Sequence, residues 1–377
     1  MSDKKLTVWE AACIITGYGI GGGVLALPYI AQKNGIIISF IILVVAFGAS
    51  WLLHMMIAET AAKCGEGAQI VSVFSRFLFR GKYAKALSIS FFALMAFILV
   101  TNLTAYIAGA AEVIAGFLNI SLLACKLIFY VVAASVVIFG LKAVGISEKL
   151  AVLIIFILIG VLAAASFFVP ANPLPVKAGT FKDGLSLFAM MMLSFSAFFS
   201  VPQAVQGLGG DMKKVRRAVF LGLGNNFILI LVITLCALLS STEVTDVAMT
   251  GWSAGIGTWA QIVGGVFTTL AMLTTYWSLS LALAGIIEEQ LRLNGKLCWL
   301  LATLPSFILS LANIGGFIDF LEMAAGAIAI VVAVMVVPTY RNTRLEVPGG
   351  SLGVLGSKPF RIFTIIAYLL MAIGSII

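Results

Sequence analysis

The sequence predicts an all-α integral membrane protein with about eleven transmembrane helices, arranged as a 5+5 inverted repeat followed by one extra C-terminal helix. Three observations predict this fold class. The 377 residues are 62% hydrophobic and only 10% charged, with a mean hydropathy of +1.16, whereas a soluble protein carries about 25% charged residues. The apolar residues form runs long enough to cross a bilayer. Two of these runs contain helix-breaking residues at matching positions of two halves.

The apolar runs define the expected membrane spans, whose limits are approximate. No cleavage site of small residues accompanies the first run, so we expect a retained helix and not a signal peptide. The expected spans are 8–31, 36–62, 85–117, 122–141, 148–169, 184–209, 215–240, 259–291, 294–312, 314–338 and 359–377.

Lysine and arginine set the expected orientation, because cytoplasmic connections of membrane proteins carry an excess of both. With a cytoplasmic N-terminus, 19 of the 23 Lys and Arg residues lie inside, and only Lys33, Lys126, Lys177 and Lys182 lie outside. We therefore expect a multi-pass protein of the cytoplasmic membrane with an extracytoplasmic C-terminus, in which 241–258 forms an external cap. The net charge of +8 follows mostly from this bias and needs no nucleic acid partner.

The first span contains a glycine cluster. Gly17, Gly19, Gly21, Gly22 and Gly23 fall within seven residues, and each costs a helix interior about 1 kcal/mol relative to alanine. Irregular backbone at membrane depth must be buried in protein or line a cavity. Such broken helices form the binding sites of secondary transporters. Close packing through small residues is the alternative, but the density of the cluster favours a break.

The sixth span is also expected to be broken. Pro202 lacks an amide proton and disturbs the preceding turn, which predicts a break around 196–201. Pro28 is expected to close the first broken region, five spans earlier. The first five spans start inside and the next five start outside, so the two halves have opposite topology. We therefore assign 1–169 to the first inverted repeat, 184–338 to the second and 359–377 to the additional helix.

Several motifs resemble those of a known family. The segment from Gly19 to Pro28 is similar to the first-helix signature of bacterial aromatic and hydroxy amino acid permeases, the tryptophan/tyrosine permease group of the amino acid/auxin permease family. Leu103–Ala115, Ser200–Ala204 and Asp211–Arg216 also match. The resemblance spans nearly the whole chain and implies the fold of the sodium-coupled leucine transporters.

The resemblance implies a secondary active transporter that imports a neutral L-amino acid, aromatic or hydroxy-bearing among the options, by cation symport and alternating access. It leaves the identity of the amino acid and the oligomeric state open, and implies no cofactor. A channel is disfavoured because no polar ring repeats along several spans. A membrane enzyme is disfavoured because the chain has one histidine, no HExxH and no clustered Asp pair.

The candidate substrate site combines the two breaks with spans 3 and 8. Amide protons at the start of the outer half of span 1 suit a carboxylate, and carbonyls at the breaks suit an ammonium. No charged residue lies within 12–31 or 184–208, so a neutral substrate side chain is expected. For the aromatic candidates, packing alone is the alternative. The candidate substrate-binding residues are Gly17, Tyr18, Gly21, Gly22, Gly23, Leu103, Tyr106, Phe195, Ser196, Phe198, Phe199, Thr275 and Tyr276.

Span 8 carries Ala271-Met-Leu-Thr-Thr-Tyr276, similar to the stretch that binds sodium in sodium-coupled relatives. The resemblance implies an oxygen cage suited to a hard cation, whereas back-bonding of the threonines to their own helix is the alternative. Some proton-coupled relatives place a lysine in the middle of span 5. Residues 150–169 contain none, which favours sodium. Proton coupling, which is usual among the permeases that the chain resembles, is the alternative. The expected ligands are Tyr18, Gly21, Ala271, Thr274 and Thr275.

Three other polar residues and the cysteines complete the candidates. His54, the only histidine, lies in span 2, where a structural role is favoured over a ligand role. Asp319 and Glu322 in span 10 are candidates for an extracellular gate. The five cysteines are scattered without metal-ligand spacing, which predicts free thiols.

Overall fold

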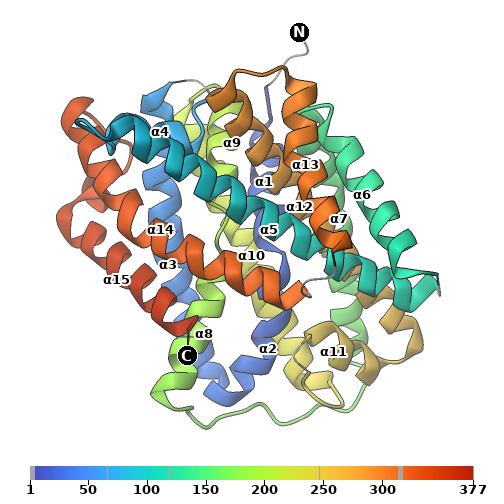
Figure 1. Cartoon of the computed structure of the whole chain (residues 1–377). Coiled ribbons are helices and arrows are strands. Elements are labelled where there is room, and N and C mark those ends of the chain that lie inside the picture. Colours follow the sequence, from blue (N-terminus) through green and yellow to red (C-terminus); the bar gives the residue numbers. More distant parts are fainter. Residues whose placement is uncertain (1–4, 66, 119, 246, 313–316, 377) are drawn as a thin grey trace.

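The computed structural model describes the chain apart from residues 1–4, 66, 119, 246, 313–316 and 377. Residue 22 and most residues of 317–333 are described by their backbone alone, so the predicted gate residues Asp319 and Glu322 lie outside the described side chains. All regular structure in the described part of the chain is helical (Figure 1). The helices are α1 (Val8–Gly19), α2 (Gly22–Asn34), α3 (Ile36–Cys64), α4 (Ile70–Phe77), α5 (Ala84–Leu118), α6 (Leu122–Val137), α7 (Leu141–Ser166), α8 (Phe181–Ser194), α9 (Ser200–Gly207), α10 (Met212–Ser240), α11 (Ala248–Ile256), α12 (Thr258–Leu291), α13 (Gly295–Leu311), α14 (Phe317–Glu346), η1 (Gly353–Gly356) and α15 (Lys358–Gly374).

Each expected span overlaps with one helix or with a pair of helices. In the described residues, α3, α5, α7, α10 and α12 are long and apolar enough to cross a membrane, and the bent pair α1/α2 makes a sixth candidate. The total of eleven spans and the inverted repeat, with its boundaries at 1–169, 184–338 and 359–377, stay predictions. All five cysteines are free thiols, as expected.

The first span is broken between α1 and α2. A capping box starts α1: the Glu10 amide donates to the Thr7 hydroxyl, and the Thr7 amide donates to the Glu10 carboxylate. The helix ends at Gly19, α2 starts at Gly22, and the two axes differ by 59°. Pro28 does not close this break, because it lies inside α2. The glycines alone therefore account for the interruption.

The sixth span is broken between α8 and α9, over residues 195–199. Pro202 is the third residue of α9, in the first helical turn, where a missing amide proton costs no hydrogen bond within the helix. A short turn, in which the Ser200 amide donates to the Ala197 carbonyl at 3.0 Å, joins the two helices. The break expected around 196–201 thus lies one to two residues earlier.

Helix α7 begins at Leu141, seven residues before the expected start of span 5. The expected start at 148 is too late, because the polar residues at 142, 148 and 149 lie within the helix and not before it. Lys142 pairs with Glu10 of α1 at 2.7 Å, which allows a charged residue inside the helical segment. One face of α7 is apolar and exposed, at Leu150, Leu153 and Ile157, as expected of a surface in contact with lipid. The opposite face is buried against α1 and α12.

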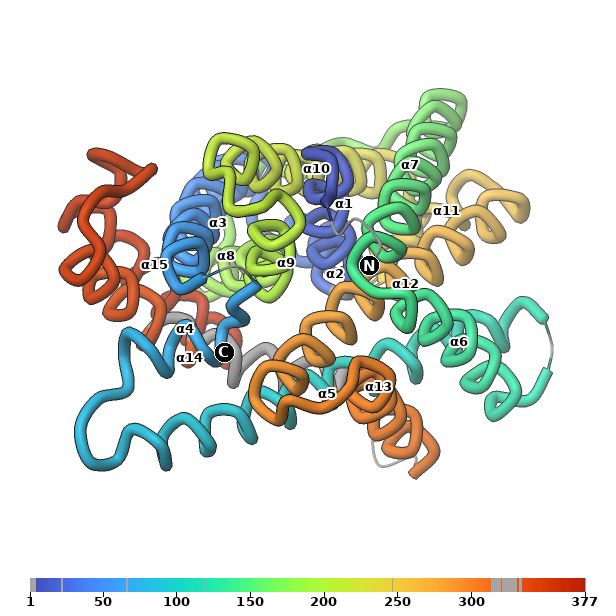
Figure 2. The backbone as a smooth tube through the Cα atoms, turned by 90° about the horizontal axis from the view of Figure 1, so that it is seen from above, coloured from blue at the N-terminus to red at the C-terminus, as the bar shows by residue number. Residues whose placement is uncertain are grey.

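The broken helices lie in the interior of the bundle. Figure 2 shows α1 and α9 near the middle of the molecule, with α3, α10, α7 and α12 around them. Helix α1 packs against α7, α9, α10 and α12. In Figure 1, α2, α8 and α11 lie at the lower end and α4 and α9 at the upper end, so elements expected on the same side of a membrane lie together.

Candidate substrate and cation site

The two helix breaks lie against each other. A Cβ atom added to Gly19 would lie 2.9 Å from the Ser194 carbonyl oxygen, and one added to Gly23 would lie 2.7 Å from the Ser194 hydroxyl. Both distances are shorter than side-chain carbons adopt, so a larger residue at either position would force Ser194 to shift. The backbone of the first break therefore packs directly against the end of α8, where the second break begins.

Five oxygen atoms from α1 and α12 meet beside the first break. Thr275 Oγ1 lies 2.9 Å from the Gly17 carbonyl oxygen, 3.0 Å from that of Ala271 and 3.5 Å from that of Tyr18. Thr274 Oγ1 lies 2.8 Å from the Ala271 carbonyl oxygen and 3.3 Å from that of Gly17. We call these three carbonyls and two hydroxyls the oxygen cluster. The five oxygens share only two hydroxyl protons, so several of their lone pairs remain free to bind a cation. Hard cations prefer oxygen ligands.

The oxygen cluster contains four of the five expected cation ligands and also Gly17, which the sequence assigns to the substrate. Gly21 lies beside the cluster: a Cβ added there would lie 2.9 Å from Thr275 Oγ1, while its carbonyl accepts from the Val24 amide at 3.3 Å. The threonines bond to the Ala271 carbonyl of their own helix and also reach α1. Back-bonding and contact with α1 therefore occur together.

A carboxylate-sized anion would find donors at the start of α2. Gly21 is the N-cap and Gly22 the first helical residue, so the amides of Gly22 and Gly23, which precede the Val24 amide bonded to Gly21, have no partner within the helix and lie at the positive end of its dipole. The Tyr106 hydroxyl of α5 approaches the same point, 2.5 Å from where a Cβ of Gly21 would lie. Leu103 is buried one turn earlier on α5. The Tyr106 contact brings span 3 to the first break.

Aromatic rings of the second break divide into two groups. Phe199 lies 6.4 Å from the Tyr18 ring, and Phe198 lies 4.7 Å from Phe199, between ring centres. Phe195 instead contacts Phe47 of α3 at 5.8 Å. The structure therefore places Phe198 and Phe199 near the first break.

Two further candidates make contacts elsewhere. Tyr276 contacts Phe129 of α6, with ring centres 5.9 Å apart, and its hydroxyl lies 3.5 Å from that of Ser306 in α13. Because it follows Thr275 directly, it faces a different side of α12. The Ser196 hydroxyl donates to the Met192 carbonyl at 2.9 Å. None of these contacts of Tyr276 and Ser196 involves α1.

His54 supports the second break. Its side chain is fully buried, with Nδ1 2.6 Å from the Ser50 carbonyl oxygen and Nε2 accepting from the Ala197 amide at 3.0 Å. Only the neutral tautomer with a proton on Nδ1 satisfies both contacts. The histidine therefore satisfies a backbone donor freed by the break, which is a structural role of the kind expected for span 2.

Sequence reasoning missed two buried polar residues at the site. Glu148 of α7 is fully buried; its Oε1 lies 2.7 Å from the Ser278 hydroxyl, and its Oε2 has no hydrogen-bond partner among the described residues. Asn226 of α10 is also fully buried, its amide lacks partners in the same part of the chain, and it abuts Gly19. Glu148 was missed because it stood at the expected end of a span. Asn226 stands next to Asn225 within an apolar span, a signal that could have identified it.

A cavity of about 500 Å³ lies at the expected cytoplasmic end, between α9, α12, α13 and the connection from α6 to α7. Its lining includes Lys142, Glu288, Trp299 and Gln203. Gln203 of α9 is 2% exposed and donates to the Ser278 carbonyl at 2.9 Å. Since the Ser278 hydroxyl also donates to Glu148, Gln203 and Ser278 connect the lining of the cavity to the Glu148 side chain.

Comparisons with known proteins agree with this architecture. A model described as the tryptophan/tyrosine permease family matches residues 4–375. Glutamine transporter 2 of Aliivibrio fischeri is 24% identical over 351 residues, which cover 87% of each chain. The structure of Mhp1, a nucleobase-cation-symport-1 family transporter in a closed conformation with bromovinylhydantoin bound, superposes with a TM-score of 0.65 at 14% identity, over 100% of this chain and 93% of the other. This structural similarity supports a shared fold.

Proposed function

The chain belongs to the tryptophan/tyrosine permease family, so it is a multi-pass membrane transporter of amino acids and not an enzyme, and from this premise we propose that it imports a neutral L-amino acid by sodium symport. Uptake would proceed by alternating access in the cytoplasmic membrane, with the N-terminus cytoplasmic and the C-terminus outside. The observation that carries the proposal is the oxygen cluster beside the break between α1 and α2.

Sodium is the proposed coupling ion because the cluster offers only oxygen donors. Gly17, Tyr18 and Ala271 supply carbonyls, and Thr274 and Thr275 supply hydroxyls. Hard cations prefer such ligands. The cluster lies next to the start of α2, so a bound cation and a substrate carboxylate would attract each other. Binding of one would then favour binding of the other, which is the requirement for symport.

The proposed substrate is an amino acid with a neutral side chain. Its carboxylate would bind the first amides of α2 and its ammonium the carbonyls at the two breaks. The aromatic rings of Tyr18, Phe198 and Phe199 would surround the side chain. The glutamine transporter of Aliivibrio fischeri, by its name, handles a neutral amino acid, which supports this class of substrate. No cofactor is part of the proposal.

Thermal stabilisation of the purified protein tests both parts of the proposal. Each of the twenty amino acids is added with sodium or with potassium at fixed pH, and the melting temperature is recorded. A ligand that binds only the folded state raises that temperature by mass action. We expect neutral amino acids to stabilise the protein only when sodium is present. A sodium-independent shift that varies with pH would support proton symport, and no shift with any amino acid would contradict the proposal.

Transport into proteoliposomes separates symport from a channel. An inward sodium gradient should accumulate the stabilising amino acid above its external concentration, and collapse of the gradient should release it. A channel would only equilibrate the two concentrations. Replacement of the sodium gradient by a proton gradient of equal size provides the matched comparison for the coupling ion.

A further inference from the structure

Among the described side chains, Glu148 differs from the other buried carboxylates in having no cationic partner. Glu10, 4% exposed, pairs with Lys142 at 2.7 Å and lies 4.0 Å from Lys149. Glu59, 2% exposed, has four partners, described below. Glu148 is 0% exposed, and in the described residues only the Ser278 hydroxyl contacts its carboxylate. An ionised carboxylate so placed needs a positive charge that the described side chains do not supply.

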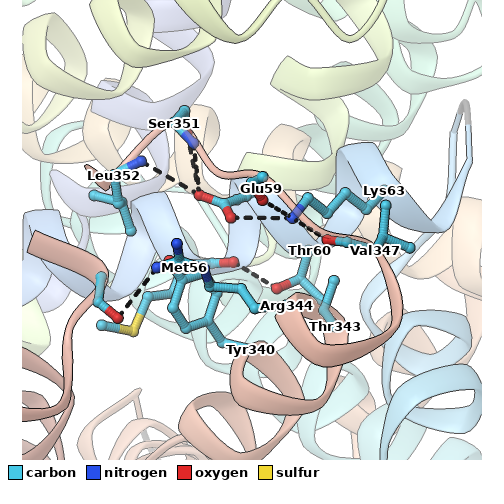
Figure 3. A network of polar contacts seen from close by, with 12 residues as sticks. Met56, Glu59, Thr60, Lys63, Tyr340, Thr343, Arg344, Val347, Ser351 and Leu352 are labelled. Atoms are coloured by element: carbon cyan, nitrogen blue, oxygen red, sulfur yellow. Dashed lines mark hydrogen bonds and ion pairs between the residues drawn. The ribbon is translucent and has the colours of Figure 1, made fainter. Parts of the chain in front are cut away.

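Figure 3 shows the partners of Glu59 for comparison. Lys63 donates to Oε1 at 3.3 Å, and the Ser351 amide and hydroxyl donate to Oε2 at 3.0 and 3.3 Å. The Leu352 amide adds a fourth contact to Oε2 at 3.4 Å. This network joins α3 to the segment before η1, more than 280 residues later in the chain. Glu59 therefore has a structural role that is complete without a ligand.

The unpartnered oxygen of Glu148 points toward the oxygen cluster. A Cβ added to Gly17 would collide with Glu148 Oε2 and would also lie 3.0 Å from Thr274 Cβ. The carboxylate and Thr274 therefore flank the same glycine, whose carbonyl belongs to the cluster. Ser278 follows Thr274 by one helical turn and holds the other carboxylate oxygen at 2.7 Å. The side chain is thus fixed at Oε1 and directed toward the cluster through Oε2.

The cluster and the carboxylate compensate each other electrically. If only the neutral oxygens of the cluster bound a cation, its charge would be buried without a counter-charge. If no cation were bound, an ionised Glu148 would be a buried anion without a counter-charge. A sodium ion between them would give a neutral group and would complete the coordination of Oε2. Lys142 and Lys149 of the same helix do not take this place, because both face Glu10.

We propose that Glu148 is an anionic ligand of the coupling cation, acting with the oxygen cluster of α1 and α12. This inference rests on the proposed sodium symport, which it extends by a residue from α7. The proposal accounts for three observations. Glu148 is fully buried, its Oε2 has no partner among the described residues, and residue 17 is a glycine. Any side chain at position 17 would occupy the place of the carboxylate.

Sodium binding to purified protein tests the proposal without transport. The readouts are the rise in melting temperature with sodium, in the absence of amino acid, and direct binding of radioactive sodium. In Glu148→Gln, an isostere without charge, we expect the half-saturating sodium concentration to rise by about tenfold or more. Amino acid binding at saturating sodium should persist. Glu59→Gln is the matched control, and it should keep the sodium affinity of the wild type whatever its melting temperature.

The outcomes separate this inference from the proposed function. Unchanged sodium affinity in Glu148→Gln overturns the role of Glu148 and leaves sodium symport intact. Amino acid binding by the wild type without any effect of sodium overturns sodium coupling and this inference together. Sodium binding that depends on Glu148, in a protein that no amino acid stabilises, supports the inference and contradicts the proposed substrate. If Glu148→Gln is not recovered folded, Glu148→Asp decides, because withdrawing the carboxylate by one methylene should also weaken sodium binding.

Discussion

At the scale of single residues, Thr275 makes the most contacts between α12 and the first break. Its hydroxyl lies within 3.0 Å of the carbonyl oxygens of Gly17 and Ala271. We predict that Thr275→Ala lowers sodium affinity by about tenfold or more, and that it lowers amino acid affinity less when that affinity is measured at saturating sodium. Sodium titrations of the melting temperature, with and without amino acid, measure both quantities.

Thr268 provides the matched control for this substitution. It lies two turns earlier on α12, is 4% exposed, and its hydroxyl donates to the Gly264 carbonyl of its own helix at 2.9 Å. Thr268→Ala removes the same atoms without touching the oxygen cluster, so its sodium affinity should equal that of the wild type. A wild-type sodium response in Thr275→Ala would remove this residue from the proposed site.

Gly17 leaves no room for a side chain at the proposed site. We predict that Gly17→Ala destabilises the protein by about 1–3 kcal/mol, the usual cost of overpacking a core, because the new methyl group would collide with the Glu148 carboxylate and approach Thr274. It should also weaken sodium binding, since both neighbours belong to the proposed site. Gly48→Ala on α3 is the control: no atom lies within 4 Å of its added Cβ, so the melting temperature should not fall.

The sequence could indicate some of these residues but not others. The threonine pair of α12 and the glycines of α1 were identifiable, because their residue types and spacing match a motif. The place of Glu148 was not, because a carboxylate seven residues after Leu141 is indistinguishable in sequence from a polar residue at the end of a span. Only the packing of α7 against α1 and α12 shows that it is buried. Likewise, the sequence alone does not show that the Thr275 side chain points toward α1, whereas the Tyr276 side chain points toward α6 and α13.

At the scale of elements, the break between α8 and α9 depends on a side chain from α3. His54 Nε2 accepts from the Ala197 amide at 3.0 Å. We predict that His54→Ala destabilises the protein by about 1–3 kcal/mol, the cost of an unsatisfied buried donor, plus the cost of the cavity left by the ring. It should also weaken amino acid binding, because the break loses its fixed shape. Thermal unfolding and amino acid titrations at saturating sodium measure the two effects.

Thr60→Ala on the same helix is the control for the histidine. The Thr60 hydroxyl is buried and donates only to the Met56 carbonyl of α3 in the bonds described, at 2.7 Å. Its loss should change stability little and amino acid affinity not at all. If His54→Ala bound amino acid as the wild type does, the histidine would stabilise the fold without shaping the site.

The positions of the elements were largely predictable, and the exceptions share a cause. The glycine cluster correctly predicted the interruption of the first span, where α1 ends at Gly19 and α2 begins at Gly22. Pro28 and Pro202 were weaker signals: one lies within α2 and the other in the first turn of α9. A proline fixes its own φ and lacks an amide proton, but membrane helices tolerate it both in the first turn and within the helix, so the surrounding packing decides whether the helix ends there. The early start of α7 also depended on a partner, Glu10 of α1.

At the scale of the whole molecule, composition and charge distribution identified the class of protein, since an interior and a surface that are both apolar fit only a membrane. The coupling ion could not be established in this way, because the proposed cation site combines atoms from α1, α7 and α12 that lie far apart in the chain. The orientation rests on the excess of Lys and Arg in connections on one side. The cavity at the expected cytoplasmic end offers a direct test of that orientation.

Ala284 of α12 lines this cavity, and Thr242 is exposed in the connection expected outside. In a background with the five native cysteines replaced, we predict that Ala284→Cys reacts with a membrane-impermeant thiol reagent only when the reagent reaches the cytoplasmic face of vesicles. Thr242→Cys should react only from the opposite face.

Saturating sodium and amino acid should slow the reaction at Ala284→Cys, because ligands shift an alternating-access transporter away from states open to one side. Reaction of both variants from the same face would contradict the orientation, and an unchanged rate with ligands would contradict closure of this cavity during transport.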